Sequence, residues 1–181
     1  MNVFYLDKDP ILAARMHNDK HVVKMIVEYA QLMSTAHRVL DGEMYLGLTK
    51  NGRKIKRWKM DNPEMEEVLY KASHINHPSA IWARSSNNNY TWLYCLFTAL
   101  CDEYTFRYGK VHATDTLLRD VLVTLPKNIQ VGYKTQPPQA MPDDVKVEGN
   151  SISAYKNYYI NYKSGFNKYT KREVPVWLTS I

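Results

Sequence analysis

The chain has few cysteines, and their positions argue against a disulfide framework. Cys95 and Cys101 are the only two in 181 residues. They lie six residues apart on a segment that we expect to form one helix, so their side chains point to different faces and cannot easily pair. We expect both to be reduced core residues in a reducing compartment, and neither to be a catalytic nucleophile.

Several familiar motifs are missing altogether. The sequence has no glycine-rich phosphate loop, no paired CxxC motif and no nucleophile elbow. It also has no hydrophobic run long enough to span a membrane and no signal peptide, so we expect a soluble, intracellular, cytoplasmic protein without a membrane partner. The chemistry that these absences leave open is that of amines and carboxylates.

The charge balance and the aromatic residues favour a polyanionic partner. Lys and Arg outnumber Asp and Glu by 24 to 18, a formal net charge of +6, and 14 Tyr and 4 Trp accompany only 4 Phe. Positive charge suits a polyanion. Tyr and Trp rings suit stacking on bases, although they also suit half-buried positions. The composition therefore favours a polyanionic partner such as a nucleic acid, while the oligomeric state stays open.

The hydrophobic pattern is mainly that of helices, so we predict a mainly α fold. A chain of 181 residues suffices for one compact helical domain, 1–181, and leaves little room for two. Two long core helices are predicted over residues 17–38 and 86–108. Shorter helices are predicted over residues 11–16, 63–73, 112–125 and 151–162, with a basic, loop-like segment at 43–62 and a long irregular one at 126–150.

The first long helix carries a polar stripe between apolar flanks. At about 100° per residue, positions three or four apart share a narrow sector of a helix. The stripe consists of His17, His21, Lys24, Glu28, Gln31, Thr35 and Arg38. One interpretation is the floor of a cleft, with Glu28 as an acid, base or electrostatic group governed by burial and neighbouring cations. The other is a partly exposed helix with an ordinary wet face.

Residues 51–59, NGRKIKRWK, combine cations with an aromatic ring. Asn51-Gly52 is a turn signal, so the segment can form a hairpin. It is either a solvated, mobile loop or an element whose cations, Lys54 and Arg57 among them, contact phosphates while Trp58 stacks or wedges.

Other cations and rings are candidate contacts to nucleic acid. Arg84 suits either a phosphate contact or a structural ion pair, and Glu103 is expected to pair with Arg107 one turn on. The candidates outside residues 51–59 are His21, Arg84, Arg107, Lys110, Tyr155, Lys156 and Tyr159. Trp82 and Trp92 are expected in the core, and Trp177 is expected to hold the C-terminal tail.

The order of several motifs resembles the pyrimidine-dimer DNA glycosylases of the phage endonuclease V type and their bacterial relatives. The segment HVVKMIVEYAQL, residues 21–32, aligns without gaps with that family's first long helix. There a histidine lies seven residues before the catalytic glutamate, and the matching positions here are His21 and Glu28. The stretch from His77 to Lys110 and the segment YKNYY, residues 155–159, resemble two later blocks of the family.

The resemblance implies a compact, mainly helical fold and an N-terminal amine as nucleophile. In that family the amine attacks C1′ of the damaged nucleotide and forms an imine, and the glutamate supports base departure and β-elimination. Carried over, Met1 supplies the amine, Glu28 the carboxylate, and Lys24 lies one turn from Glu28. Protein α-amines are in general substantially neutral near pH 8. The resemblance therefore implies a DNA glycosylase/AP lyase-like repair enzyme of a phage-infected cell that acts on double-stranded DNA without a cofactor.

The chain departs from the family at positions that matter for substrate. Two arginines that hold the DNA backbone in the family correspond to Val27 and Gln31 here, and Asn2 is bulky enough to leave Met1 in place. These departures put the dimer substrate in question.

Two alternatives stay open. The first is a non-catalytic nucleic-acid-binding protein that uses the basic segments. The second is an enzyme with a His/Glu site acting on a nucleotide or modified base, built on His17, His21, His77 and Glu28. His17 and His21 have the i, i+4 spacing of zinc ligands, but the segment between them lacks the glutamate of the zinc-protease motif, so we expect no metal.

Overall fold

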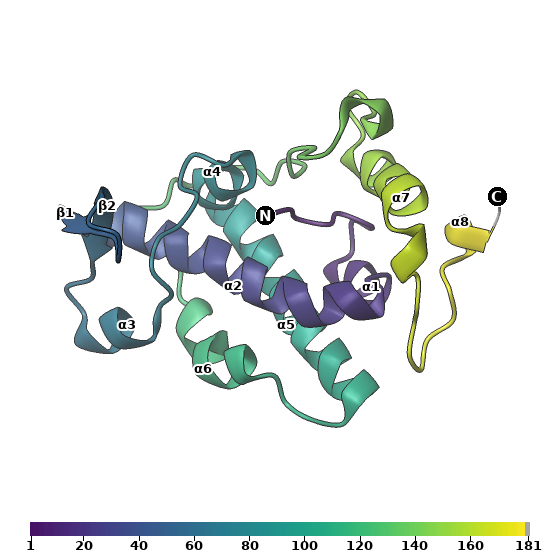
Figure 1. Cartoon of the computed structure of the whole chain (residues 1–181), viewed down its shortest axis with the longest axis horizontal. Coiled ribbons are helices and arrows are strands. Elements are labelled where there is room, and N and C mark those ends of the chain that lie inside the picture. Colours follow the sequence, from purple (N-terminus) through teal and green to yellow (C-terminus); the bar gives the residue numbers. More distant parts are fainter. Residues whose placement is uncertain (180–181) are drawn as a thin grey trace.

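The structure, a computed structural model that describes residues 1–179, is mainly helical (Figure 1). Its two long helices are α2 (Asp19–Asp41) and α5 (Asn87–Tyr108). The other elements are α1 (Pro10–Arg15), β1 (Glu43–Leu48), β2 (Lys54–Lys59), α3 (Pro63–Val68), α4 (Pro78–Ser85), α6 (Ala113–Leu122), η1 (Asp143–Val145), α7 (Ser151–Tyr162), η2 (Ser164–Phe166) and α8 (Val176–Thr179). The mainly α prediction, with two long core helices, is confirmed.

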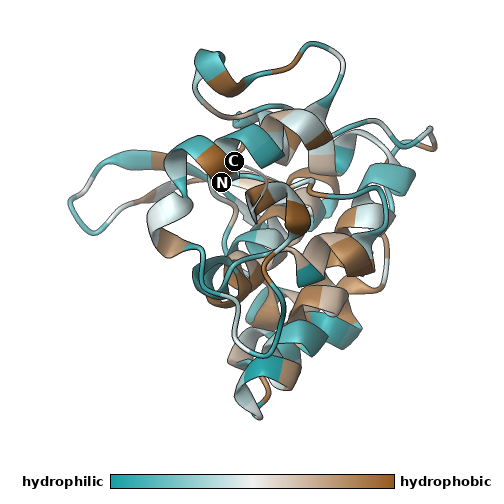
Figure 2. Cartoon of the chain, turned by 90° about the vertical axis from the view of Figure 1, so that its right-hand side faces the viewer, coloured by the Kyte–Doolittle hydropathy of each residue, from teal (hydrophilic) through white to brown (hydrophobic). Residues whose placement is uncertain are grey.

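Helix α2 runs through the middle of the molecule and packs on α4, α5 and α6 (Figure 1). Most helices carry both hydrophobic and hydrophilic residues, the pattern of helices with one buried face (Figure 2). The apolar faces of α2 and α5 join one core cluster. Complete burial of each large aliphatic or aromatic side chain in such a cluster contributes about 1.5–3 kcal/mol, so the interface of the two helices contributes to the stability of the fold.

Helix α2 begins two residues later than predicted. The Asn18 side chain caps it by accepting from the His21 amide at 2.9 Å, which places His17 in the bend after α1 and outside the helix. At the other end the helix runs three residues beyond the predicted Arg38 to Asp41, and Gly42 is its C-cap. A Cβ at Gly42 would lie 2.6 Å from the Arg38 carbonyl oxygen, so only glycine fits where the chain turns into β1.

Helix α5 separates the two cysteines. Cys101 is buried, but Cys95 is exposed, so the prediction of two core cysteines is wrong for Cys95. Six residues on a helix correspond to about 600°, which puts the two side chains on different faces. Trp82 and Trp92 are buried, as predicted.

The N-terminal segment is buried in the core but forms no regular helix or strand. Val3, Phe4, Tyr5 and Leu6 are each no more than 3% exposed. The backbone of such a segment needs other partners than a sheet, and the Phe4 amide donates to the Tyr29 hydroxyl oxygen at 3.2 Å. The burial of these four side chains fixes the position of the first residue against α2.

Residues 43–59 form an antiparallel hairpin, which confirms the hairpin that the Asn51-Gly52 turn signal indicated. Glu43 pairs with Lys59 and Leu48 with Lys54 across the two strands. Gly52 has φ +75° in the connecting turn, a left-handed conformation that favours glycine. The hairpin lies at the C-terminal end of α2, at the opposite end of the molecule from α7 and α8 (Figure 1).

The helix predicted over residues 63–73 is too long. Helix α3 ends at Val68, and the chain continues in extended form because polar side chains of α2 bind its carbonyl groups. Arg38 donates to the Tyr70 carbonyl at 2.8 Å and Gln31 to the Lys71 carbonyl at 2.7 Å. Carbonyl groups that accept from another element are not available for an α-helical ladder.

The segment between α6 and α7 is irregular, as predicted, and is tied to the helices by polar side chains. Asn89 of α5 accepts from the Thr135 amide at 2.8 Å, and Asp41 accepts from the amides of Lys127 and Asn128. The C-terminal tail includes the short helix α8. Within residues 1–179, no helix is long and apolar enough to cross a membrane.

Candidate active site

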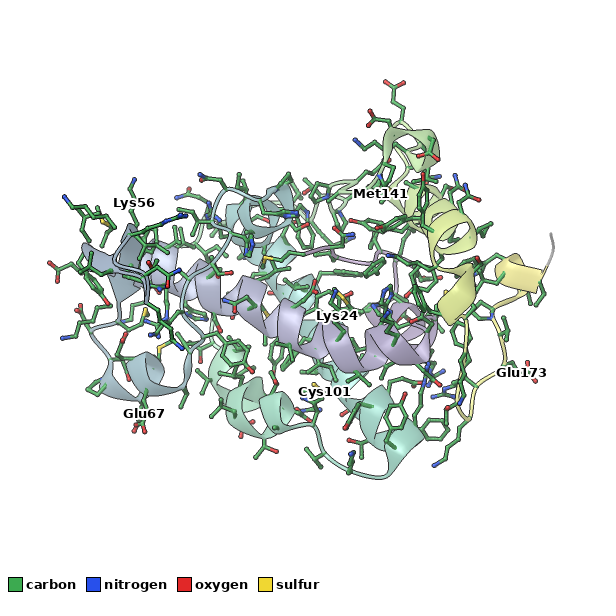
Figure 3. The ribbon with its side chains drawn as sticks, in the orientation of Figure 1. Lys24, Lys56, Glu67, Cys101, Met141 and Glu173 are labelled. Atoms are coloured by element: carbon green, nitrogen blue, oxygen red, sulfur yellow. The ribbon has the colours of Figure 1, made fainter. Side chains whose placement is uncertain are left out.

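The structure brings the N-terminal amine together with two side chains of α2. The Met1 nitrogen lies 3.6 Å from Glu28 Oε2, and Lys24 Nζ lies 3.1 Å from Glu28 Oε1. The Glu28 side chain is 20% exposed, whereas that of Lys24 is 62% exposed. Lys24 projects from the central part of α2 (Figure 3). The three residues that the sequence analysis named as catalytic are therefore neighbours.

A chain of buried hydrogen bonds holds the N-terminal segment in place. His17 Nδ1 donates to the Ala13 carbonyl oxygen at 2.7 Å, which leaves Nε2 to accept from the Tyr29 hydroxyl at 2.7 Å. The Tyr29 oxygen in turn accepts from the Phe4 amide at 3.2 Å. Complete burial lowers the pKa of His17 to about 4, so the ring is neutral and keeps this tautomer at neutral pH. His17 therefore positions the N-terminus and has no free nitrogen for a metal.

A polar cavity of about 210 Å³ adjoins the Met1 amine. Its lining consists of Met1, Asn2, Phe4, His21, Lys24, Met25, Glu28, Tyr158 and Lys163. Three amines and one carboxylate line it, so the fully ionised cavity has an excess of positive charge. Lys163 Nζ lies 4.7 Å from the centre of the Tyr158 ring, so the α7 side of the cavity combines a cation with an aromatic face.

His21 forms a neutral wall of this cavity. Its side chain stacks on Phe4, with ring centres 4.2 Å apart, and its Nδ1 lies 2.6 Å from the Tyr159 hydroxyl. Burial, reinforced by His17 and by nearby lysines, lowers the pKa of His21 to about 2. A neutral, buried imidazole cannot act as a cation for a phosphate. His21 therefore shapes the wall of the cavity and does not supply a charged contact to nucleic acid.

His77 is a neighbour of the amine that was predicted only as part of a His/Glu site. It caps α4, where its Nδ1 accepts from the Ser79 amide at 3.1 Å. Burial lowers its pKa, the positive charge of the N-terminal amine lowers it further, and the charge of Glu28 opposes both. The proximity of His77 to the amine depends on a tertiary contact between the first residue and α4. The local sequence therefore gives no signal for it.

The polar stripe of α2 divides into two parts with different roles. Lys24 and Glu28 face the cavity, whereas the part toward the C-terminus is covered by residues 69–74. Arg38 is 3% exposed and donates to carbonyl groups of Trp58, Glu66, Leu69 and Tyr70. The cleft-floor interpretation therefore applies to the turn that carries Lys24 and Glu28. The later turns of the stripe bind residues 69–74 and have a structural role.

Arg107 is a structural residue, so its prediction as a surface contact to nucleic acid is wrong. Its side chain is fully buried, with Nε 2.7 Å from Glu103 and Nη1 3.0 Å from Asp19. Arg172 of the tail lies 2.9 Å from the other Glu103 oxygen. The expected Glu103–Arg107 pair is confirmed, and Asp19 and Arg172 extend it into a network. A buried charge needs such partners because its desolvation is costly.

Two of the three α7 candidates are buried, so the predicted base stacking by Tyr155 and Tyr159 is wrong. Tyr155 donates to the Pro138 carbonyl at 2.7 Å, and the Tyr159 ring contacts Trp177 of the tail at 6.0 Å between centres. This contact agrees with the expected role of Trp177. The ring that α7 presents to the cavity is Tyr158, which the sequence analysis did not select.

The remaining candidates do not line the cavity at the amine. Lys54 is exposed on β2, Arg57 is half-buried there, and Lys110 is exposed after α5. Lys156 Nζ lies 5.5 Å from the centre of the Trp177 ring. Arg84 is half-buried, and its buried Nη1 has no hydrogen-bond partner in the part of the chain that the structure describes.

The described residues contain no group of three or more His, Cys, Asp or Glu side chains placed to hold a metal ion. His17, His21, His77 and Glu28 therefore do not form a joint ligand set. No family model, no curated protein and no solved structure matches this chain. The geometry of the site is therefore the basis for a functional proposal.

Proposed function

We propose that this chain is an amine-nucleophile enzyme acting on DNA, of the glycosylase/AP lyase kind. The observation that carries the proposal is the 3.6 Å distance between the Met1 nitrogen and Glu28 Oε2 in a polar cavity. A nucleophilic amine needs a base within reach and a fixed position. The buried N-terminal segment and the adjacent carboxylate supply both.

The chemistry requires an uncharged amine. Glu28 accepts a proton from the Met1 ammonium group, and the freed electron pair attacks C1′ of a deoxyribose. On a nucleoside the C1′–base bond breaks and the base leaves with the proton that Glu28 received; Glu28 then moves a proton from the nitrogen to O4′, and the C1′–O4′ bond opens to give the imine. On an abasic site the aldehyde oxygen takes one proton from the nitrogen and one from Glu28 and leaves as water. In both cases Glu28 is again a carboxylate. The imine so formed loses its C2′ proton to Glu28, and β-elimination then breaks the bond from C3′ to the 3′ phosphate oxygen.

The charge and size of the cavity support a sugar-phosphate ligand. Lys24 and Lys163 lie on its lining and are suited to phosphate oxygens. Its volume of about 210 Å³ is below the roughly 300–1,000 Å³ of sites that enclose a drug-sized ligand. We infer that one sugar enters the cavity while the displaced base, or a second nucleotide, stays outside.

The departures from the endonuclease V type bear on substrate choice. Gln31, where the family has an arginine, donates to the Lys71 carbonyl and is thereby committed to the fold. Val27 is 42% exposed and brings no charge. The proposal therefore concerns the amine chemistry and leaves the lesion or modified base to a substrate screen.

Borohydride trapping on duplex DNA with one abasic site tests the proposal. The N-terminus of the preparation is first established by mass spectrometry. The chain beginning at Met1 should give a covalent adduct, and a variant with one added N-terminal residue should give none. Lys24→Met serves as the matched control, because it removes an amine next to Glu28 but keeps the α-amine. Trapping that survives the extension and disappears in Lys24→Met would contradict the assignment of the nucleophile.

A second candidate function is non-catalytic binding of nucleic acid. The observation that favours it is the group of exposed cations on the β1–β2 hairpin, which lies apart from the cavity. It predicts salt-dependent DNA binding that Glu28→Gln leaves unchanged, without an adduct under borohydride.

A further inference from the structure

The β1–β2 hairpin carries a dense group of positive charges. Residues 43–59 contain six cations and one carboxylate, whereas the whole chain has a net charge of +6. The cations are Lys50, Arg53, Lys54, Lys56, Arg57 and Lys59. None of them forms an ion pair within residues 1–179. A polyanion is the partner that such a surface attracts.

Apolar side chains alternate with these cations on the hairpin. Residues directly opposite each other in an antiparallel pair point to the same face. One face is formed by the opposing pairs Met44–Trp58, Leu46–Lys56 and Leu48–Lys54. Leu46 is 66% and Leu48 is 68% exposed, which is unusual for neighbouring large aliphatic residues on one strand. Lys56 projects from the outer end of the molecule (Figure 3).

The base of the hairpin is anchored rigidly to α2. Arg38 donates to the Trp58 carbonyl at 2.9 Å and lies 2.7 Å from Glu66 Oε2, the same oxygen that accepts from the Met60 amide at 2.7 Å. The junction between α2 and β1 also needs glycine at position 42, because a Cβ there would clash with the Arg38 carbonyl oxygen. The hairpin is therefore a ribbon with a set direction, and its contacts to a partner need little ordering of the chain.

We propose that the β1–β2 hairpin inserts into the major groove of duplex DNA. That groove is about 12 Å wide and admits a two-stranded ribbon, whereas the major groove of A-form RNA is too narrow for side chains to read. Lys54, Lys56 and Arg57 contact the phosphates, and Leu46 and Leu48 lie against base edges such as the thymine methyl group. A second copy of the chain is disfavoured as occupant because two such basic surfaces repel each other.

The position of the hairpin relative to Glu28 gives a length scale. Thirteen residues of α2 separate Glu28 from Asp41, which at 1.5 Å per residue is about 20 Å along the helix, or roughly six base pairs of B-DNA. This length estimate is the one part of the inference that rests on the proposed function. It predicts that a duplex cut to fewer than about six base pairs on one side of the reacting nucleotide loses the contribution of the hairpin.

The test compares two triple variants that lose the same charge. The hairpin variant carries Lys54→Gln, Lys56→Gln and Arg57→Gln, and the control carries Lys8→Gln, Lys127→Gln and Lys168→Gln at exposed positions outside the hairpin. Affinity for a duplex of about 24 base pairs, some two helical turns, is measured by fluorescence anisotropy across a salt series. Thermal unfolding of both variants shows that they are folded.

The expected result is a loss of affinity for the hairpin variant with a salt slope smaller by about 2–3, close to 0.9 for each lost phosphate contact. The control should change the slope by less than 1. Leu46→Ser with Leu48→Ser should weaken binding several-fold at an unchanged slope. Equal slopes for the two triple variants would overturn the proposal. So would an equal loss of affinity for duplex RNA or for phosphatidylserine vesicles. Glu28→Gln, included throughout, separates this result from the proposed function, because it blocks chemistry without touching the hairpin.

Discussion

The cavity at Met1 and the β1–β2 hairpin both carry positive charge, but in opposite settings. In the cavity, a fixed amine lies 3.6 Å from a carboxylate, at the end of a segment buried in the core. On the hairpin, six cations have no ion-pair partner in the described chain and stand on a ribbon attached only at its base. A positioned amine suits chemistry at one atom, whereas dispersed cations suit many contacts along a polymer.

A third set of cations belongs to neither region. Arg38 and Arg107 are at most 3% exposed and are surrounded by carboxylates and carbonyl oxygens of the chain itself. Burial and available partners, more than residue type, therefore decide whether a cation of this protein faces a ligand. Variants that disturb one region, while trapping or DNA affinity reports on the other, test this difference.

The largest effect is expected for Glu28→Gln. The amide cannot accept the proton of the amine, and the loss of one general base reduces rates by about 10²–10⁴-fold. Trapping on abasic DNA should slow by at least about 100-fold, while DNA affinity changes by less than about twofold, because only one charge, next to the Met1 amine and Lys24, is altered. Quenched-flow trapping and anisotropy measure the two quantities. Rates that stay within threefold would exclude Glu28 as the base.

Removal of the Arg38 side chain should affect the hairpin more than the cavity. Arg38→Met leaves the Glu66 carboxylate and several carbonyl groups without their donor, and we expect a loss of about 3 kcal/mol in the free energy of unfolding. Urea denaturation measures it, with Arg15→Met as the exposed control that should stay within about 0.5 kcal/mol. At temperatures where the variant is folded, DNA affinity should fall more than the rate of trapping.

Acid should destabilise the region that holds Met1. The folded-state pKa of His17 is lowered to about 4 from an unfolded value near 6.5. The unfolded chain therefore binds the proton first, so this contribution to stability is complete above pH 6.5 and is lost as the pH falls toward 4. The loss amounts to about 3 kcal/mol. His17→Gln should flatten the pH dependence of unfolding in this window, whereas His74→Gln at an exposed position should leave it unchanged.

The smallest effect is expected for the two cysteines. The exposed Cys95 should react with a thiol reagent in the folded protein, and Cys101 only on unfolding, since burial raises the pKa of its thiol above the range in which thiolates form. Cys95→Ser should leave stability, trapping and DNA binding unchanged. Equal labelling rates of both residues under native conditions would show that the core around α5 opens readily.

Helical periodicity was enough to find the centre of the site. The spacing of Lys24 and Glu28 puts them on one face of a helix in any fold that keeps that helix. The place of Met1 was reached through the resemblance, because the course of an extended segment through a core depends on contacts that are distant in sequence. Val3 to Leu6 read as a short apolar run, and only their packing on α2 and α5 brings the amine to Glu28.

The errors share one physical cause. Tyr155, Tyr159 and Arg107 are amphipathic or charged, and such residues occupy surfaces or cores according to the partners available. A carbonyl group at Pro138 and a carboxylate at Glu103 supply those partners, and neither can be located from the local sequence. For the same reason, residues 69–73 were predicted as helix although side chains of α2 hold them extended.

The most direct test of the account is to identify the nitrogen that forms the adduct. After borohydride trapping on abasic DNA, nuclease and protease digestion leaves a sugar fragment on one peptide, which tandem mass spectrometry locates. We predict that the fragment is on the α-nitrogen of Met1. A fragment on the side chain of Lys24, Lys163 or any other lysine would contradict the central claim that the chain start is the nucleophile.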